Sequence, residues 1–242
     1  MLRKRVALFG GSFNPIHNGH IALAHAVLEQ NLVDDVWLLV SPQNPLKEQL
    51  GLKPEYCRLN LARKALQNEK HILASDFEFD LPRPSYTWNT LQALSLAYPR
   101  TEFLLLIGAD NWTCFDHWAN YKLIIQNYRL LIYPRPGYDI KADSLPVGVC
   151  VINATMLPVS STMIRDFVAN KTDISPLVPA EIVDDVVSNK RRRDRDTIVH
   201  TFAPKMFFDI LSELYTSECI VLKISVCVSV DTAKYCQHNL LH

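Results

Sequence analysis

Two histidines stand three residues apart in the segment GGSFNPIHNGH at positions 10–20. The apolar run Val6–Phe9 precedes this segment and a helical pattern over Gly19–Glu29 follows, so it joins a buried strand to a helix. Glycines allow close approach of the backbone to a ligand, and the first N–H groups of a helix attract anions. His17 and His20 project to one side, where imidazoles can donate hydrogen bonds to phosphate oxygens. The segment favours a nucleotide phosphate site over a glycine turn with two incidental histidines.

A second group of polar residues, SSTMIR, occupies positions 160–165. Its three hydroxyl residues come before a predicted helix, so one can cap that helix while the others reach a phosphate. Arg165 follows about one turn later and can hold phosphate oxygens in a fork. A capped helix with a surface arginine explains the group equally well when it is considered alone. It gains weight beside the histidine segment.

The elements that must position these groups alternate along the chain. Strands are predicted over Val6–Phe9, Val36–Val40, Ile72–Phe79, Phe103–Ile107, Arg129–Tyr133 and Val149–Ile152, and helices over Gly19–Glu29, Pro54–Gln67, Thr87–Ala97 and Pro179–Asn189. Continuous apolar runs are typical of strands buried on both faces. The alternation predicts an α/β fold with a doubly wound parallel sheet, helices on both faces and ligands beyond the carboxyl ends of the strands.

Together the two motifs resemble the Rossmann-like nucleotidylyltransferase superfamily, which carries H-x-G-H after the first strand and S-S-T-x-I-R late in the domain. Three further segments resemble the bacterial nicotinate-nucleotide adenylyltransferase family within it. They are SPQNPLK at positions 41–47, PSYT at 84–87, and GAD at 108–110 followed by Trp118. The resemblance covers residues 4–189.

This resemblance implies transfer of AMP from ATP to nicotinate mononucleotide, giving deamido-NAD and pyrophosphate in NAD biosynthesis. The implied catalytic residues are His17, His20, Lys47 and Arg165; the implied ATP-binding residues are Gly10, Ser12, Phe13, Gly108, Asp110, Ser161 and Thr162. Tyr86 and Thr87 are implied to bind the nicotinate carboxylate, and Trp118 to stack on the pyridine ring. Core packing is the alternative for Trp118, because most tryptophans are buried.

The implied chemistry is in-line attack of the mononucleotide phosphate on the α-phosphorus of ATP, without a covalent enzyme intermediate. A magnesium ion is expected to assist, held mainly by ATP phosphates, so no side chain is assigned as a metal ligand. The partners expected are the two substrates, with neither nucleic acid nor a membrane.

Two positions depart from the family pattern. Asn89 stands where an acid often follows S-Y-T-x, and Leu46 where a histidine often precedes the lysine. Both leave open nicotinamide mononucleotide or another mononucleotide as acceptor. A non-catalytic nucleotide sensor is a rival from another class, but both histidines are present. A dinucleotide-dependent oxidoreductase would need G-x-G-x-x-G after the first strand, and the chain has Gly10-Gly11-Ser12 there.

Composition limits the class of protein further. The 242 residues include 25 basic and 25 acidic residues, and zero formal charge argues against a protein that coats nucleic acid. No stretch reaches the roughly 18 apolar residues of a membrane span, and the N-terminus lacks the long apolar run of a signal peptide. A cytoplasmic protein is therefore expected. Its six cysteines form no C-x-x-C pair and are expected to be free thiols.

The charge cluster Arg191–Asp196 marks a predicted domain boundary. Residues 1–190 are predicted to form the nucleotidylyltransferase domain, and residues 191–242 a C-terminal extension of unknown role. Apolar residues in the extension, such as Phe207 and Leu211, suit cover for a sheet edge or a subunit contact. The sequence leaves a homo-oligomer open.

Overall fold

The computed structural model describes residues 3–42 and 52–188, and these build a sheet of six parallel strands in the order β3-β2-β1-β4-β5-β6. The strands are β1 (Lys4–Gly11), β2 (Asp35–Val40), β3 (Ile72–Ser75), β4 (Thr101–Gly108), β5 (Arg129–Tyr133) and β6 (Val149–Val151). The chain moves outward from β1 to β3 and then returns to place β4 on the other side of β1. This reversal confirms the predicted doubly wound, Rossmann-like sheet.

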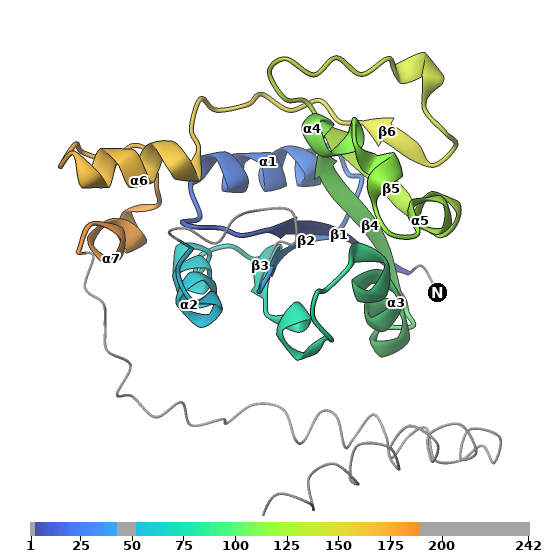
Figure 1. Ribbon diagram of the computed structural model, residues 1–242, viewed down its shortest axis with the longest axis horizontal. Helices are drawn as coiled ribbons and strands as arrows, with labels where there is room; N and C mark the ends of the chain where they lie inside the picture. The colour runs from blue at the N-terminus through green and yellow to red at the C-terminus, as the bar shows by residue number, and fades with distance from the viewer. Residues whose placement is uncertain (1–2, 43–51, 189–242) are drawn as a thin grey trace, which may run out of the picture. The chain divides into compact units, whose positions relative to one another are not determined.

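Helices cover both faces of the sheet, with α1 and α3 on opposite sides (Figure 1). The α-helices are α1 (Asn18–Glu29), α2 (Glu55–Ala65), α3 (Thr87–Ala97), α4 (Ala109–Trp112), α5 (Tyr121–Asn127), α6 (Ser161–Ala169) and α7 (Val183–Val187). Short 3₁₀ helices are η1 (Phe77–Asp80), η2 (Phe115–His117), η3 (Ala142–Ser144) and η4 (Ala180–Ile182). The short helices α4 and α5 were not predicted.

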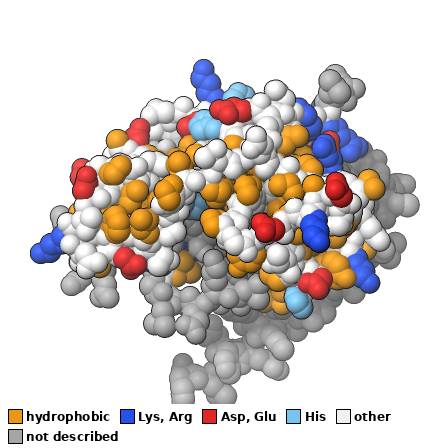
Figure 2. Space-filling model, turned by 90° about the horizontal axis from the view of Figure 1, so that it is seen from above, with side chains coloured by type: hydrophobic (Ala, Val, Ile, Leu, Met, Phe, Trp, Pro, Cys, Tyr) orange, Lys and Arg blue, Asp and Glu red, His pale blue; other side chains and the backbone are white. Residues whose placement is uncertain are grey.

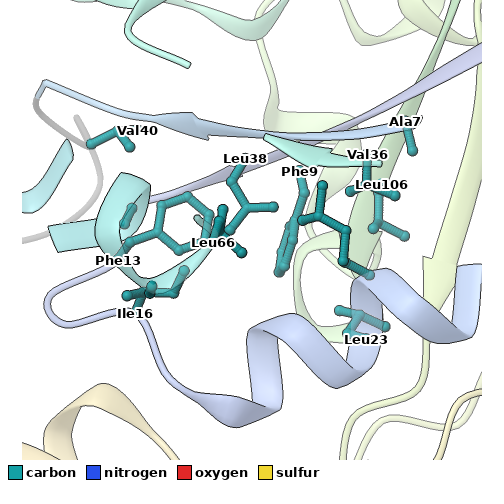
Figure 3. Close-up of a cluster of buried hydrophobic side chains, with 14 of the residues drawn as sticks. Ala7, Phe9, Phe13, Ile16, Leu23, Val36, Leu38, Val40, Leu66 and Leu106 are labelled. Atoms are coloured by element: carbon teal, nitrogen blue, oxygen red, sulfur yellow. The ribbon is translucent and has the colours of Figure 1, made fainter. Parts of the chain in front are cut away.

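Alternation of side chains along each strand divides the core into two layers. Phe9, Leu38 and Leu106 point toward one face, where they meet Leu23 of α1 (Figure 3). Their strand neighbours, such as Leu8 and Leu105, point the other way and pack with residues of α3 and α5. Both faces of the central strands are therefore buried, which explains their continuous apolar runs.

The strand predicted over Ile72–Phe79 is too long. β3 ends at Ser75, and the chain turns into η1. The Ser75 hydroxyl accepts a hydrogen bond from the backbone N–H of Phe77 at 3.2 Å, a local bond that competes with continued strand pairing. The helix predicted over Pro179–Asn189 is likewise shorter and is divided between η4 and α7.

The surface in Figure 2 carries acidic and basic side chains interspersed with apolar ones, without one dominant sign of charge. Within the described ranges, no helix has both the length and the apolar character needed to cross a membrane. Cys57, Cys114 and Cys150 are free thiols, as predicted. The predicted C-terminal extension lies outside the described residues.

Candidate active site

The loop from β1 to α1 carries a buried aromatic residue, Phe13, which lines a cleft. Phe13 is 3% exposed and has a φ of 46°, a left-handed conformation uncommon for a bulky residue. Its ring contacts Phe9 and His20 edge-on, with centroids 5.6 Å and 5.0 Å away. The ring is thus held by aromatic neighbours, and backbone strain of this kind is common at ligand sites.

His17 and His20 form a stacked pair at the start of α1. Their ring centroids lie 3.6 Å apart, and His17 is the residue that precedes the helix. The backbone N–H of His17 donates to Nδ1 of His20 at 3.2 Å. Because Nδ1 accepts this bond, a neutral His20 must carry its proton on Nε2. Nε2–H is then the group of His20 left to donate to a ligand.

Burial keeps both imidazoles neutral. It lowers the pKa of His17 to about 4, with a further contribution from the positive charge of Arg135. The pKa of His20 is also well below its usual value, first because of burial and then because of His17 and Arg135. Near pH 7 a phosphate entering here would meet uncharged N–H donors with Arg135 beside them.

The SSTMIR segment binds directly to this loop. Ser160 caps α6 by accepting a hydrogen bond from Met163 N–H at 3.1 Å, as predicted for one of the hydroxyl residues. The Ser161 hydroxyl donates to the Pro15 carbonyl at 2.8 Å, and Arg165 Nη1 donates to the Asn14 carbonyl at 2.8 Å. The two motifs, far apart in sequence, thus form one structure.

These groups line a cleft of about 500 Å³, here called the first cleft. Nine of the predicted site residues line it: Gly10, Ser12, Phe13, His17, His20, Asp110, Ser161, Thr162 and Arg165. Tyr133 and Arg135 were not predicted but also line it. The Arg135 side chain donates to the Tyr133 hydroxyl at 3.0 Å and lies 3.6 Å from Asp110 Oδ1. The position of Arg135, two residues after the end of a buried strand, was the available sequence signal.

A second cleft, of about 690 Å³, contains the predicted residues Tyr86, Thr87, Gly108 and Trp118. Gly108 and Asp110 were both predicted to bind ATP; Gly108 lines the second cleft, whereas Asp110 lines the first. Gly108 ends β4, and a Cβ added there would collide with the Asp110 carboxylate, so the Asp110 side chain occupies that direction. Trp118 lines the cleft and also packs on Phe115, with ring centroids 5.1 Å apart.

The two clefts share a wall at the carboxyl ends of β1, β4 and β5. Phe9, Gly10, Gly11, Asn111 and Tyr133 line both of them. A Cβ added to Gly10 would have no atom within 4 Å, so this glycine faces open space. The wall lies where the strand order reverses between β1 and β4, the usual ligand position in such sheets. Two ligands, one in each cleft, would meet here.

A buried arginine that sequence reasoning missed supports the first cleft. Arg58 on α2 is 1% exposed, and its guanidinium donates to the carbonyls of Ser12 and Ser41 at 2.6 Å and 2.9 Å. It also donates to the carbonyls of Pro42 and Lys53, at 3.1 Å and 2.8 Å. Nothing in the sequence distinguishes this arginine from a solvated one on an amphipathic helix.

Comparison with known proteins agrees with this geometry. A family model described as cytidylyltransferase-like matches residues 8–167. A protein of Bacteroides fragilis named as a probable nicotinate-nucleotide adenylyltransferase is 40% identical over 201 residues, which are 83% of this chain and 100% of that protein. A protein of Bacteroides thetaiotaomicron with the same name is 45% identical over 170 residues, covering 70% of this chain and 84% of its own.

The chain belongs to the nicotinate-nucleotide adenylyltransferase family. Its members are nucleotidyltransferases, so the predicted enzyme class is confirmed. A solved structure titled Plasmodium falciparum nicotinic acid mononucleotide adenylyltransferase complexed with NaAD has a TM-score of 0.64 and covers 76% of this chain and 95% of its own. At 19% identity it supports the fold.

Two positions of this chain, Asn89 and Leu46, depart from the pattern of the family. Asn89 is exposed on α3 and lines neither cleft. The acid that the family often has at this position would therefore not line either cleft. Leu46 and Lys47 fall within residues 43–51, outside the described residues. The predicted role of Lys47 in neutralising phosphates therefore stays a prediction.

Proposed function

We propose that the protein transfers AMP from ATP to nicotinate mononucleotide, giving deamido-NAD and pyrophosphate. The observation that carries this proposal is the shared wall of the two clefts, which lets the ends of two nucleotides meet at Gly10 and Gly11. A single-substrate site or a nucleotide sensor needs one cleft, whereas transfer between two nucleotides needs two that meet.

ATP is proposed to occupy the first cleft. Its phosphates accept hydrogen bonds from His20 Nε2–H, His17 and the backbone at Ser12 and Phe13. Arg165 stabilises the charge with Ser161 and Thr162 nearby, although Arg165 Nη2 already donates to Thr162 Oγ1 at 3.0 Å. Asp110 lies on the adenosine side, where its carboxylate can accept from ribose hydroxyls.

Nicotinate mononucleotide is proposed to occupy the second cleft. Thr87 starts α3, so its backbone N–H is one of the unpaired donors of the first turn and is suited to a carboxylate. Tyr86 precedes it, and Trp118 offers an aromatic face for the pyridine ring. The mononucleotide phosphate would then point toward the shared wall.

The reaction forms one P–O bond and breaks another. An oxygen of the mononucleotide phosphate attacks the α-phosphorus of ATP, and the bond between that phosphorus and the bridging oxygen to the β-phosphate breaks. The electron pair leaves with pyrophosphate, so neither a covalent enzyme intermediate nor a redox step is required. Neutral histidine donors and the cations Arg165 and Arg135 stabilise the charge that shifts toward the leaving group.

Nucleotidyltransferases act with a divalent metal ion and ATP, and we propose magnesium here. Within the described residues, no group of three or more histidine, cysteine or acidic side chains could hold a metal. Asp110 is the one acid among the described residues lining the first cleft, and it lies beside Arg135. These residues suit an ion held through ATP phosphates, which would neutralise charge on the triphosphate.

The experiment is to incubate the protein with ATP, magnesium and nicotinate mononucleotide and to identify products by mass spectrometry. Equal amounts of deamido-NAD and pyrophosphate are expected. Consumption of ATP without a dinucleotide product would reject the proposed function, as would binding of ATP without turnover for any mononucleotide.

A further inference from the structure

A buried acid, Glu78 of η1, forms part of the wall of the second cleft. It is 8% exposed, and its two carboxylate oxygens accept hydrogen bonds from side-chain hydroxyls. Thr90 Oγ1 donates to Oε1 at 3.0 Å, and Ser85 Oγ donates to Oε2 at 3.4 Å. The Ser41 hydroxyl also hydrogen-bonds to this carboxylate.

The three hydroxyl donors come from three different segments of the chain. Ser41 follows β2, Ser85 directly precedes Tyr86 and Thr87, and Thr90 lies in the first turns of α3. All three, like Glu78, line the second cleft, and none lines the first. The carboxylate therefore connects the segments that make one side of the mononucleotide site.

Burying the Glu78 carboxylate lowers the stability of the folded protein. Burial raises the pKa of Glu78, although hydrogen bonds from the hydroxyls partly oppose the shift. An acid whose pKa is raised on folding makes the protein less stable above the pKa of its unfolded form, because the charged form must be buried. Apolar residues in place of both the acid and its hydroxyl partners would avoid that cost, so the fold alone does not account for this polar cluster.

We propose that Glu78 is a positioning residue for the mononucleotide. Its carboxylate holds Ser85-Tyr86-Thr87 and the start of α3 in the geometry that receives the pyridine carboxylate. This inference rests on the proposed function and assigns a role to a residue that does not itself react. Loss of Glu78 should therefore weaken mononucleotide binding and leave ATP binding unchanged.

The test compares KM for each substrate in Glu78→Leu, Glu78→Gln and Thr90→Val. In Glu78→Leu, KM for nicotinate mononucleotide should rise about tenfold or more, because both acceptors are lost, while KM for ATP stays within about twofold. Glu78→Gln keeps an acceptor for Thr90 and should show a smaller rise. A purely structural role would lower the melting temperature of Glu78→Leu and raise both KM values together, whereas a positioning role raises KM for the mononucleotide alone.

Glu69→Leu is the matched control, since Glu69 pairs with His25 and lines neither cleft. Both KM values should match the wild type in this variant. A Glu78→Leu enzyme with unchanged KM for the mononucleotide, or with equal rises for both substrates, overturns the inference. If Glu78→Leu does not fold, the nearly isosteric Thr90→Val is used instead. The inference then requires a higher KM for the mononucleotide and an unchanged KM for ATP in that variant.

Wild-type measurements separate this inference from the proposed function. A wild-type protein that makes no dinucleotide rejects the proposed function, and calorimetric titration of nicotinate mononucleotide alone then tests Glu78 without turnover. A wild-type protein that is active while its variants keep normal KM values rejects only the role of Glu78.

Discussion

The backbone N–H of His17 donates to Nδ1 of His20 at 3.2 Å, and the two rings stack 3.6 Å apart. This bond fixes which nitrogen of His20 carries the proton, and it leaves Nε2–H as the phosphate donor. His20→Asn should separate the two roles, because the asparagine oxygen can still accept from His17 N–H but no donor reaches the position of Nε2.

For His20→Asn we expect kcat to fall by about two orders of magnitude or more, since one transition-state donor is worth roughly 3 kcal/mol. The circular dichroism spectrum and melting temperature should stay close to those of the wild type. Turnover near the wild-type rate in a folded variant would show that His20 is not a phosphate donor.

The lowered pKa of His17 predicts acid sensitivity. Between about pH 6.5 and pH 4 the unfolded chain binds a proton at His17 that the folded chain does not, so stability should fall as the pH falls through this window. At pH 5 this residue alone should cost about 2 kcal/mol relative to pH 7. His17→Asn should lose that part of the pH dependence.

Urea unfolding at pH 7 and pH 5 measures the effect in each protein. The opposing contribution of Glu78, whose raised pKa makes its burial less costly at low pH, is common to both and cancels in the comparison. His117→Asn serves as the control because the His117 side chain is 81% exposed. Identical pH dependence in wild type and His17→Asn would contradict a buried, neutral His17.

Arg58 should be essential to the stability of the site loops. Arg58→Met leaves the carbonyls of Ser12, Ser41, Pro42 and Lys53 without this donor, and buried acceptors without partners cost about 1–3 kcal/mol each. The free energy of unfolding should drop by at least about 3 kcal/mol. Arg63→Met, on the same helix but half-exposed in an ion pair with Asp76, should cost less than about 1 kcal/mol. Equal losses of unfolding free energy in the two variants would contradict this role of Arg58.

The domain boundary predicted at residue 190 is also testable. The described residues of both clefts lie before it, with Arg165 the last of them. A chain ending at Lys190 should keep its KM for ATP and most of its kcat, with a lower melting temperature if residues 191–242 support assembly. A truncated chain that stays folded but no longer binds ATP would place the extension in the site.

Local patterns predicted the sheet because its central strands are buried on both faces and therefore consist of continuous apolar residues. The bounds of α3 and β5 match the prediction, β1 extends two residues further at each end, and α1 begins one residue earlier than predicted. The end of β3 was missed because Ser75 starts a turn inside an otherwise β-like stretch. Cytoplasmic location and a homo-oligomer stay predictions.

The site was predictable where a residue belongs to a compact motif, as His17, His20 and Arg165 do. Arg58, Glu78 and Arg135 were missed because their roles depend on partners distant in the chain. The Arg58 guanidinium reaches Ser12 across 46 positions, and neither residue alone indicates the bond. Asp110 and Gly108 were predicted to act together, but residues close together at a strand end can face different clefts: Asp110 lines the first and Gly108 the second.

Acceptor choice tests the central claim most directly. Pyrophosphate release should be measured with ATP, magnesium and either nicotinate mononucleotide or nicotinamide mononucleotide, and kcat/KM compared. A site that presents N–H donors to a carboxylate leaves them poorly paired with an amide, so we predict a preference of about 100-fold or more for the acid. Equal values, or a preference for the amide, would contradict the account.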